Sequence, residues 1–149
     1  MDREDVIQTE GMIFPLLPEH TRRFFEDGKT VFVKFFGKGS NPQRLRIGSR
    51  LFFYESERNK EVVGEAKIVE INSETADTVL TKYGHTLFLT PAELDEYAKQ
   101  RREKKMLVLV LKGAKRYKTP LKLKKSVTMA GQYMTAQMHE SMIRSMRRP

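Results

Sequence analysis

The stretch GKTVFVKFFGKGSNPQRLRIGSRLFFYESE, residues 28–57, sets two apolar runs around a polar loop. The runs at 30–36 and 49–56 are rich in β-branched and aromatic residues, which favour strands over helices. The loop between them is dense in turn residues. Its charged side chains are all basic, namely Lys38, Arg44, Arg46 and Arg50. We therefore predict two buried strands that form a rigid frame and present a cationic loop.

Three further runs are typical of strands. Residues 61–71, EVVGEAKIVEI, follow the second run after a short polar turn, which predicts a β-hairpin. Residues 6–17 alternate weakly, and KMLVLVLKG at 105–113 is the clearest buried strand of the sequence. The basic segment 114–125 contains Pro120, so we expect an edge strand or an extended loop there.

Helix signals lie between these runs. Pro18 suits the first position of a helix and Gly28 suits its left-handed cap, which predicts a helix over 18–27. Ser73 can cap a second helix that closes on Gly84.

Two more helices are predicted toward the C-terminus. The sequence TPAE at 90–93 is a capping box with proline at the first helical position, and it indicates a helix to about residue 101. From residue 131 onward the composition favours a helix. There Met134, Met138, Met142 and Met146 repeat every four residues.

The order of these elements defines a fold class. It does not show the regular βα alternation of a parallel sheet, and 149 residues suit one domain. We predict an α+β, mainly β architecture. It is a small curled sheet or pseudo-barrel of five to six mixed strands, with short helices on the rim and a C-terminal helix. The domain is expected to span 1–130, and 131–149 to form a Met/Arg-rich helix or tail.

The charge of the chain is unevenly distributed. Its formal net charge is +9. Residues 1–100 contain 14 Lys and Arg against 17 Asp and Glu, whereas residues 101–149 contain 14 against only two. A basic surface of this kind attracts polyanions because bound cations release counterions from phosphates. This asymmetry favours a nucleic-acid partner over a merely solvated basic face.

Several classes of function receive no support from the sequence. The chain has no cysteine, and its three histidines are far apart, so we expect neither a metal nor another cofactor. No run is long and apolar enough for a membrane span, and the acidic N-terminus is unlike a signal peptide. We expect a soluble cytoplasmic protein without a membrane partner. Phosphate-loop and hydrolase motifs are absent as well.

The first candidate site lies on the opening stretch. Phe32 and Lys34 share one face of the first run, where a base could stack on a ring while an ammonium meets a phosphate. The alternative is a half-buried strand whose lysine reaches water. Further candidate contacts of this cluster are Lys29, Arg44, Arg46 and Tyr54.

The second candidate site is LKGAKRYKTPLKLKK at 111–125. Its lysines and arginine surround Tyr117, a pattern that can follow a phosphate backbone. We select Lys115, Tyr117 and Lys118 as contacts. The methionine repeat of the C-terminal helix is expected to pack, either within the chain or across a homodimer, because methionine also suits adaptable contact surfaces.

The order of several motifs resembles the PUA-like superfamily, including its ASCH and EVE-like members. These motifs are DGKTVFVKF, RIG, RLFFYES, VVGEAKIVEI and LTPAEL, and the resemblance covers about residues 5–133. Within the superfamily the sequence is most similar to an uncharacterised archaeal family. The resemblance implies a small pseudo-barrel and the recognition of RNA or modified bases.

The resemblance also implies roles for single residues. In ASCH domains a lysine enters the strand, an acid or threonine follows three residues later, and a basic residue stands two further on. This chain has Lys29 and Lys34 at the two basic positions, but Phe32 at the acid or threonine position. Lys29 and Lys34 are thus implied as ligand contacts, and catalysis is not.

We therefore predict a domain that binds RNA, or a modified nucleoside within it, in a basic groove between residues 38–50 and 112–125. One alternative is a small ASCH-type hydrolase, an amidohydrolase or ribonuclease, in which Lys29 works with a glutamate such as Glu55, Glu57 or Glu65. A third is a protein adaptor that acts through the C-terminal helix.

Overall fold

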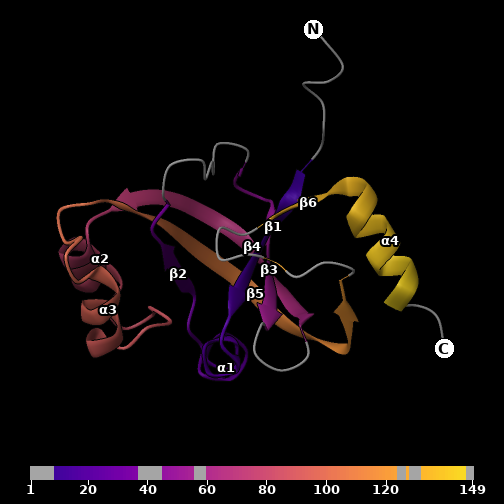
Figure 1. The fold of residues 1–149 in the computed structure, drawn as a ribbon, viewed down its shortest axis with the longest axis horizontal. Coiled ribbons are helices and arrows are strands. Elements are labelled where there is room, and N and C mark those ends of the chain that lie inside the picture. Colours follow the sequence, from indigo (N-terminus) through magenta and orange to yellow (C-terminus); the bar gives the residue numbers. More distant parts are fainter. Residues whose placement is uncertain (1–8, 37–44, 56–59, 124–126, 128–131, 147–149) are drawn as a thin grey trace, which may run out of the picture.

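The computed structural model describes residues 9–36, 45–55, 60–123, 127 and 132–146. Figure 1 shows these residues as one bent sheet with helices at its ends and rim. The strands are β1 Thr9–Leu16, β2 Val31–Lys34, β3 Arg50–Glu55, β4 Glu61–Glu74, β5 Met106–Lys122 and β6 Gln132–Thr135. The helices are α1 Pro18–Glu26, α2 Ala76–Tyr83, α3 Pro91–Ala98 and α4 Ala136–Met146.

The six strands form one mixed sheet in the order β2-β5-β4-β3-β1-β6. β1 pairs with β3 in parallel, and the other neighbouring strands are antiparallel. This confirms the predicted α+β, mainly β class and the hairpin of β3 and β4. Among the described residues no pairing joins the edge strands β2 and β6, so the sheet does not close into a barrel.

The sheet nevertheless curls strongly. Three strands separate β1 from β2, so the two would lie about 19 Å apart in a flat sheet with a spacing of about 4.8 Å. Yet the rings of Phe14 on β1 and Phe32 on β2 stack with centroids 5.1 Å apart. The long strands β4 and β5 accommodate this bend, with register shifts at three places in their pairing. β1 and β2 therefore face each other across the curl.

Successive side chains of a strand point to opposite faces of the sheet, and a separate hydrophobic core lies on each face. On β3, Leu51 and Phe53 point into the larger core, whereas Phe52 and Tyr54 point into the smaller one. The larger core lies inside the curl and includes Phe24 of α1. The smaller core lies on the other face, where α4 packs.

Two predicted helix ends agree with the structure. α1 begins at Pro18, and Gly28 just beyond it has a φ of 70° in the left-handed region. At α3, the Thr90 hydroxyl accepts from the backbone N–H of Glu93, and the Glu93 carboxylate accepts from the backbone N–H of Thr90. The capping box is confirmed.

Ser73 does not cap a helix, so that prediction was wrong. Ser73 belongs to β4 and pairs with Leu107 of β5, because the long β5 extends the ladder through Glu74. Helix α2 begins only at Ala76, with Thr75 as its N-cap.

The basic segment after residue 113 continues β5 as a single strand. Among the described residues, the part of β5 beyond residue 113 pairs only with β4, which agrees with the edge strand, one of the two predicted alternatives.

The predicted helix from residue 131 begins too early. Residues 132–135 form β6, which pairs with β1, and the helix starts at Ala136. Met134 therefore lies on a strand, whereas Met138 and Met142 lie on α4. All three pack in or against the smaller core, which confirms packing within the chain for these methionines.

None of the helices in the described part of the chain is long and apolar enough to cross a membrane.

Candidate nucleic-acid binding site

A pocket of about 490 Å³ lies where β1 and β2 face each other across the curl. Its walls come from the end of β1 and the start of α1, from β2, from the segment before α3, and from α3 itself. The lining is mainly apolar and comprises Pro15, Leu16, Leu17, His20, Phe32, Val33, Lys34, Phe88, Leu89, Glu93, Glu96 and Tyr97. The rings of Phe32 and Phe88 line the pocket and stack with centroids 5.3 Å apart. Phe32 is 2% exposed and also stacks with Phe14, so its ring supports this aromatic wall but offers no free face for a base to stack on, contrary to the prediction.

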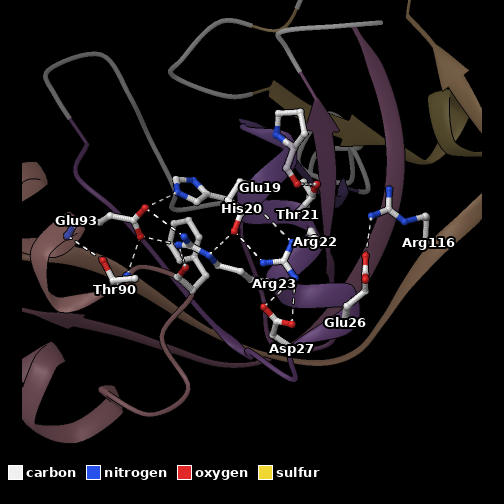
Figure 2. Close-up of polar contacts among 12 residues, drawn as sticks. Glu19, His20, Thr21, Arg22, Arg23, Glu26, Asp27, Thr90, Glu93 and Arg116 are labelled. Carbon is white, nitrogen blue, oxygen red and sulfur yellow. Dashed lines mark hydrogen bonds and ion pairs between the residues drawn. The ribbon is translucent and has the colours of Figure 1, made fainter.

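One polar corner of the pocket is held by α1 and α3. Figure 2 shows His20 and Arg23 of α1 meeting Glu93 of α3. Arg23 donates to Glu93 Oε1 at 2.5 Å and to the Phe88 carbonyl at 2.9 Å, while His20 Nε2 lies 3.5 Å from Glu93 Oε2. The hydrogen bonds from Arg23 lower the pKa of Glu93 to about 2. This carboxylate is therefore ionised and already neutralised by a cation.

Lys34, at the end of β2, is another charged residue that lines the pocket. It is half-buried, and its Nζ lies 5.6 Å from the centroid of the Phe14 ring. Burial, and secondarily the positive charge of Arg101, lower its pKa. Among the described residues no carboxylate lies within 4 Å of Lys34 Nζ. A half-buried ammonium of this kind can bind an anion from outside the chain.

Of the predicted contacts, Phe32 and Lys34 meet at the pocket and Lys29 does not line it. Lys29 Nζ donates to the His85 carbonyl at 2.9 Å. The glutamates expected beside it have other partners. Glu55 accepts from Thr21 and lies 3.8 Å from Arg116.

Glu65 is likewise not paired with Lys29. It lies 2.7 Å from Arg50 Nε and accepts from the Tyr117 hydroxyl at 2.8 Å. Burial and the charge of Glu65 raise the pKa of Tyr117. Glu57 lies outside the described residues. The lysine–glutamate pair of the hydrolase hypothesis therefore does not form between Lys29 and Glu55 or Glu65.

Tyr54 and Tyr117 belong to the other face of the sheet. Tyr54 is 1% exposed within the smaller core, so its ring offers no free face for stacking. Tyr117 is half-buried and packs against the same core. The predicted aromatic contacts are thus divided between two surfaces, because Phe32 lies inside the curl.

The same outer face carries a row of cations across three strands. Arg50 of β3 lies opposite Lys67 of β4, and Lys67 lies opposite Lys112 of β5. Residues paired in this way share one face of a sheet. We call these three residues the basic row. It joins the end of the predicted cationic loop to the start of the predicted basic segment through Lys67, which the sequence did not single out.

The remaining predicted cations lie around this face or outside the described chain. Lys115 is exposed and lies opposite Glu65, and Lys118 is exposed further along β5. Arg46 is exposed before β3, and its Nη1 donates to the Leu45 carbonyl at 2.9 Å. Lys38 and Arg44 lie outside the described residues.

The sequence did not identify His20, Phe88 or Tyr97 as site residues. The sequence identified Glu93 only as part of the capping box of a helix, which is a structural role, and not as a residue of a site. No local pattern connects α1, β2 and α3, because residues distant in the chain meet at the pocket through the curl.

The fold is similar to that of ASCH proteins of known structure. The ASCH protein of Zymomonas mobilis superposes with a TM-score of 0.75 at 16% identity, covering 89% of this chain and 93% of that protein. A serine-to-alanine mutant of the same protein gives a TM-score of 0.78 at 17% identity, over 94% of this chain and 99% of the other.

The chain belongs to the DUF365 family, a domain of unknown function whose family model matches residues 9–136. A relative, the uncharacterised archaeal protein MJECS03 of Methanocaldococcus jannaschii, is 26% identical over 107 residues. The match covers 65% of this chain and 99% of that protein. The predicted resemblance to ASCH domains is confirmed for the fold, and the predicted similarity to an uncharacterised archaeal protein is confirmed as well.

Proposed function

We propose that this protein binds single-stranded RNA and inserts one base, standard or modified, into the pocket between β1 and β2. The observation that carries the proposal is the position of Lys34 at the wall of a largely apolar pocket, two residues from the aromatic ring of Phe32. An apolar cavity with a few polar groups suits a planar base, and the ammonium suits its phosphate. The ASCH fold supports the same class of ligand.

The basic row is proposed to add an electrostatic contribution to the affinity for RNA. Arg50, Lys67 and Lys112 would contact phosphates of the flanking strand without reading its sequence. Lys29, Arg46, Lys115 and Lys118 are proposed as further phosphate contacts, and so is Arg44 of the cationic loop. Tyr54 is omitted because its ring is buried, and Tyr117 remains a candidate only at its exposed edge.

The proposal is tested by fluorescence anisotropy with labelled single-stranded RNA, duplex RNA and single-stranded DNA of equal length across a salt series. We expect single-stranded RNA to bind best. We also expect its affinity to fall with salt, by a log–log slope of about −0.7 for each phosphate contacted. Equal affinity for all three polymers would overturn specific recognition of RNA.

A variant with a blocked pocket tests whether RNA binding depends on the insertion of a base or only on electrostatic attraction. Leu17 lines the pocket and is 42% exposed, so Leu17→Trp should fill the entrance without disturbing the core. Leu80 is 37% exposed on α2 and does not line the pocket, which makes Leu80→Trp the matched control. We expect Leu17→Trp to weaken RNA binding about tenfold and Leu80→Trp to leave it unchanged. Equal binding by both variants would remove the pocket from the proposal.

The same samples reveal catalysis if it occurs. Shortened or chemically altered RNA after incubation, lost in Lys29→Ala while binding persists, would favour the hydrolase instead. We expect intact RNA.

A further inference from the structure

Arg101 occupies a fixed position beside the pocket. Its guanidinium carbon lies 4.3 Å from the ring centroid of Phe35 and 5.1 Å from that of Tyr97. Its Nη2 also donates to the Tyr97 carbonyl at 2.7 Å. The Tyr97 hydroxyl in turn accepts from the Phe35 backbone N–H at 2.8 Å. These contacts hold the guanidinium against Phe35, which directly follows Lys34, the last residue of β2.

The backbone after α3 sets this position. Gln100 has a φ of 68°, which is uncommon for a residue with a side chain, and the next N–H, from Arg101, returns to the Ala98 carbonyl at 2.8 Å. The chain thus folds back over the end of α3, and Arg101 follows Tyr97 at a spacing of four residues. Tyr97 lines the pocket, and Arg101 does not line it but lies against the Tyr97 ring just beyond the lining.

Several arginines of α1 and of the segment after α3 are paired with carboxylates. Arg22 pairs with Glu19, Arg23 with Glu93, and Arg102 with Asp77. In the described part of the chain no carboxylate lies within 4 Å of Arg101 or Lys34, although Glu93 and Glu96 line the same pocket. The positive charge of Arg101 contributes, after burial, to the lowered pKa of Lys34, and an anion bound near both cations would relieve this repulsion.

Two polar residues of α3 line the pocket one turn apart. Glu93 and Tyr97 are four residues apart, which is about 6 Å along a helix, and Arg101 follows the end of α3 and lies against the Tyr97 ring. This side of the pocket therefore runs from a neutralised carboxylate at Glu93 to Tyr97, behind which the cation of Arg101 lies. A ligand of matching polarity has an uncharged ring system at one end and an anionic group at the other.

We propose that Lys34 and Arg101 form a phosphate subsite at the edge of the pocket, so that the bound unit is a nucleotide and not a free nucleoside. This inference rests on the proposed function, since it takes the pocket as the site of the base. The guanidinium presents several donors to phosphate oxygens, and the ammonium of Lys34 adds a point charge.

The test uses the full chain, with side-chain ¹⁵N NMR signals of lysine and arginine as the readout. The probes are the four ribonucleosides, their 5′- and 3′-monophosphates, ribose 5-phosphate and inorganic phosphate. We expect the monophosphates to bind at least about tenfold more tightly than the matching nucleosides. We also expect ribose 5-phosphate to shift the Arg101 Nε–Hε signal.

Variants assign the effect to the two cations. Arg101→Met and Lys34→Met should each abolish the preference for the phosphorylated ligand, while Arg101→Lys should retain part of it. Lys104→Met is the control, because Lys104 is exposed and does not line the pocket. Circular dichroism identifies any variant that fails to fold.

The possible results distinguish failure of the phosphate subsite from failure of the proposed function. If nucleosides and monophosphates bind equally, or if no phosphate probe shifts the Arg101 signal, the subsite is wrong while base insertion can still hold. If phosphates bind through Lys34 and Arg101 but the base adds nothing and Leu17→Trp has no effect on RNA binding, the subsite holds and the proposed function fails.

Discussion

Phe14 of β1 and Phe32 of β2 stack with ring centroids 5.1 Å apart, although three strands lie between their own strands in the sheet. This contact fixes the curl that brings the two walls of the pocket together. Phe32 also stacks on Phe88, so the same ring supports both the fold and the aromatic wall. The stability of the core and the shape of the site are therefore coupled.

Truncation of this ring should unfold the protein more easily and enlarge the pocket. Phe32 is 2% exposed, and Phe32→Ala is expected to lower the free energy of unfolding by about 3–5 kcal/mol. Urea denaturation measures the loss. Ile47→Ala, at a side chain that is 68% exposed, is the control and should change it by less than about 0.5 kcal/mol. A small effect at Phe32 would mean that the curl does not depend on this stack.

Removal of the Thr90 hydroxyl should destabilise α3. The hydroxyl accepts from the Glu93 backbone N–H at 3.1 Å, and loss of such a cap costs about 0.5–2 kcal/mol. Thermal unfolding of Thr90→Ala should show the loss, whereas Thr90→Ser keeps the oxygen and should stay close to the parent. If both variants lose equal stability, the stabilisation comes from the methyl group of Thr90 and not from its hydroxyl cap.

The Glu93 carboxylate should make stability depend on pH. Its pKa is lowered from 4.5 to about 2 by hydrogen bonds from Arg23, so its contribution is fully present above about pH 4.5. The contribution is lost as the pH falls through about 2, where the carboxylate becomes protonated in the folded state. Glu93→Gln preserves the N3 position and removes the charge. We expect the variant to be less stable than the parent at pH 7 and the difference to shrink toward pH 2.

The measurement is the urea midpoint of both proteins from pH 2 to pH 7. Glu96→Gln is the matched control, since Glu96 also lines the pocket but makes no ion pair with the described residues. Its difference from the parent should be small at both ends of this range. A Glu93→Gln difference that does not vary with pH would contradict the role of the Arg23 pair.

Helix α4 should contribute to the fold of the domain. Met142 is 2% exposed in the smaller core, and Met142→Ala is expected to cost about 2–5 kcal/mol. Gln137→Ala, on the exposed side of the same helix, should be nearly neutral. Urea denaturation distinguishes the two. If Met142→Ala left stability unchanged, α4 would be free to act on a partner, as the adaptor hypothesis requires.

Local patterns predicted most of the elements. The β-branched and aromatic runs gave β2, β3 and β5, and the proline and capping-box signals gave the starts of α1 and α3. The two errors arose where pairing over distance decided the conformation. Ser73 extends β4 because β5 lies beside it, and residues 132–135 form a strand because β1 offers an open edge.

The candidate site was predictable only in part. Phe32 and Lys34 were found because they alternate on one strand with the side chains suited to a base and a phosphate. No local pattern singled out Arg101, since the role proposed for it depends on its contacts with Phe35, which follows β2, and with Tyr97 of α3.

The sequence by itself determined the fold class, most of the order of the strands and helices, and the accumulation of positive charge in the last third of the chain. These properties depend on residue type and short spacing. Only the tertiary structure decided that the sheet stays open, that β1 and β2 enclose a pocket, and that Tyr54 is buried away from it. The curl sets these features, and the curl depends on the packing of side chains that are far apart in the chain.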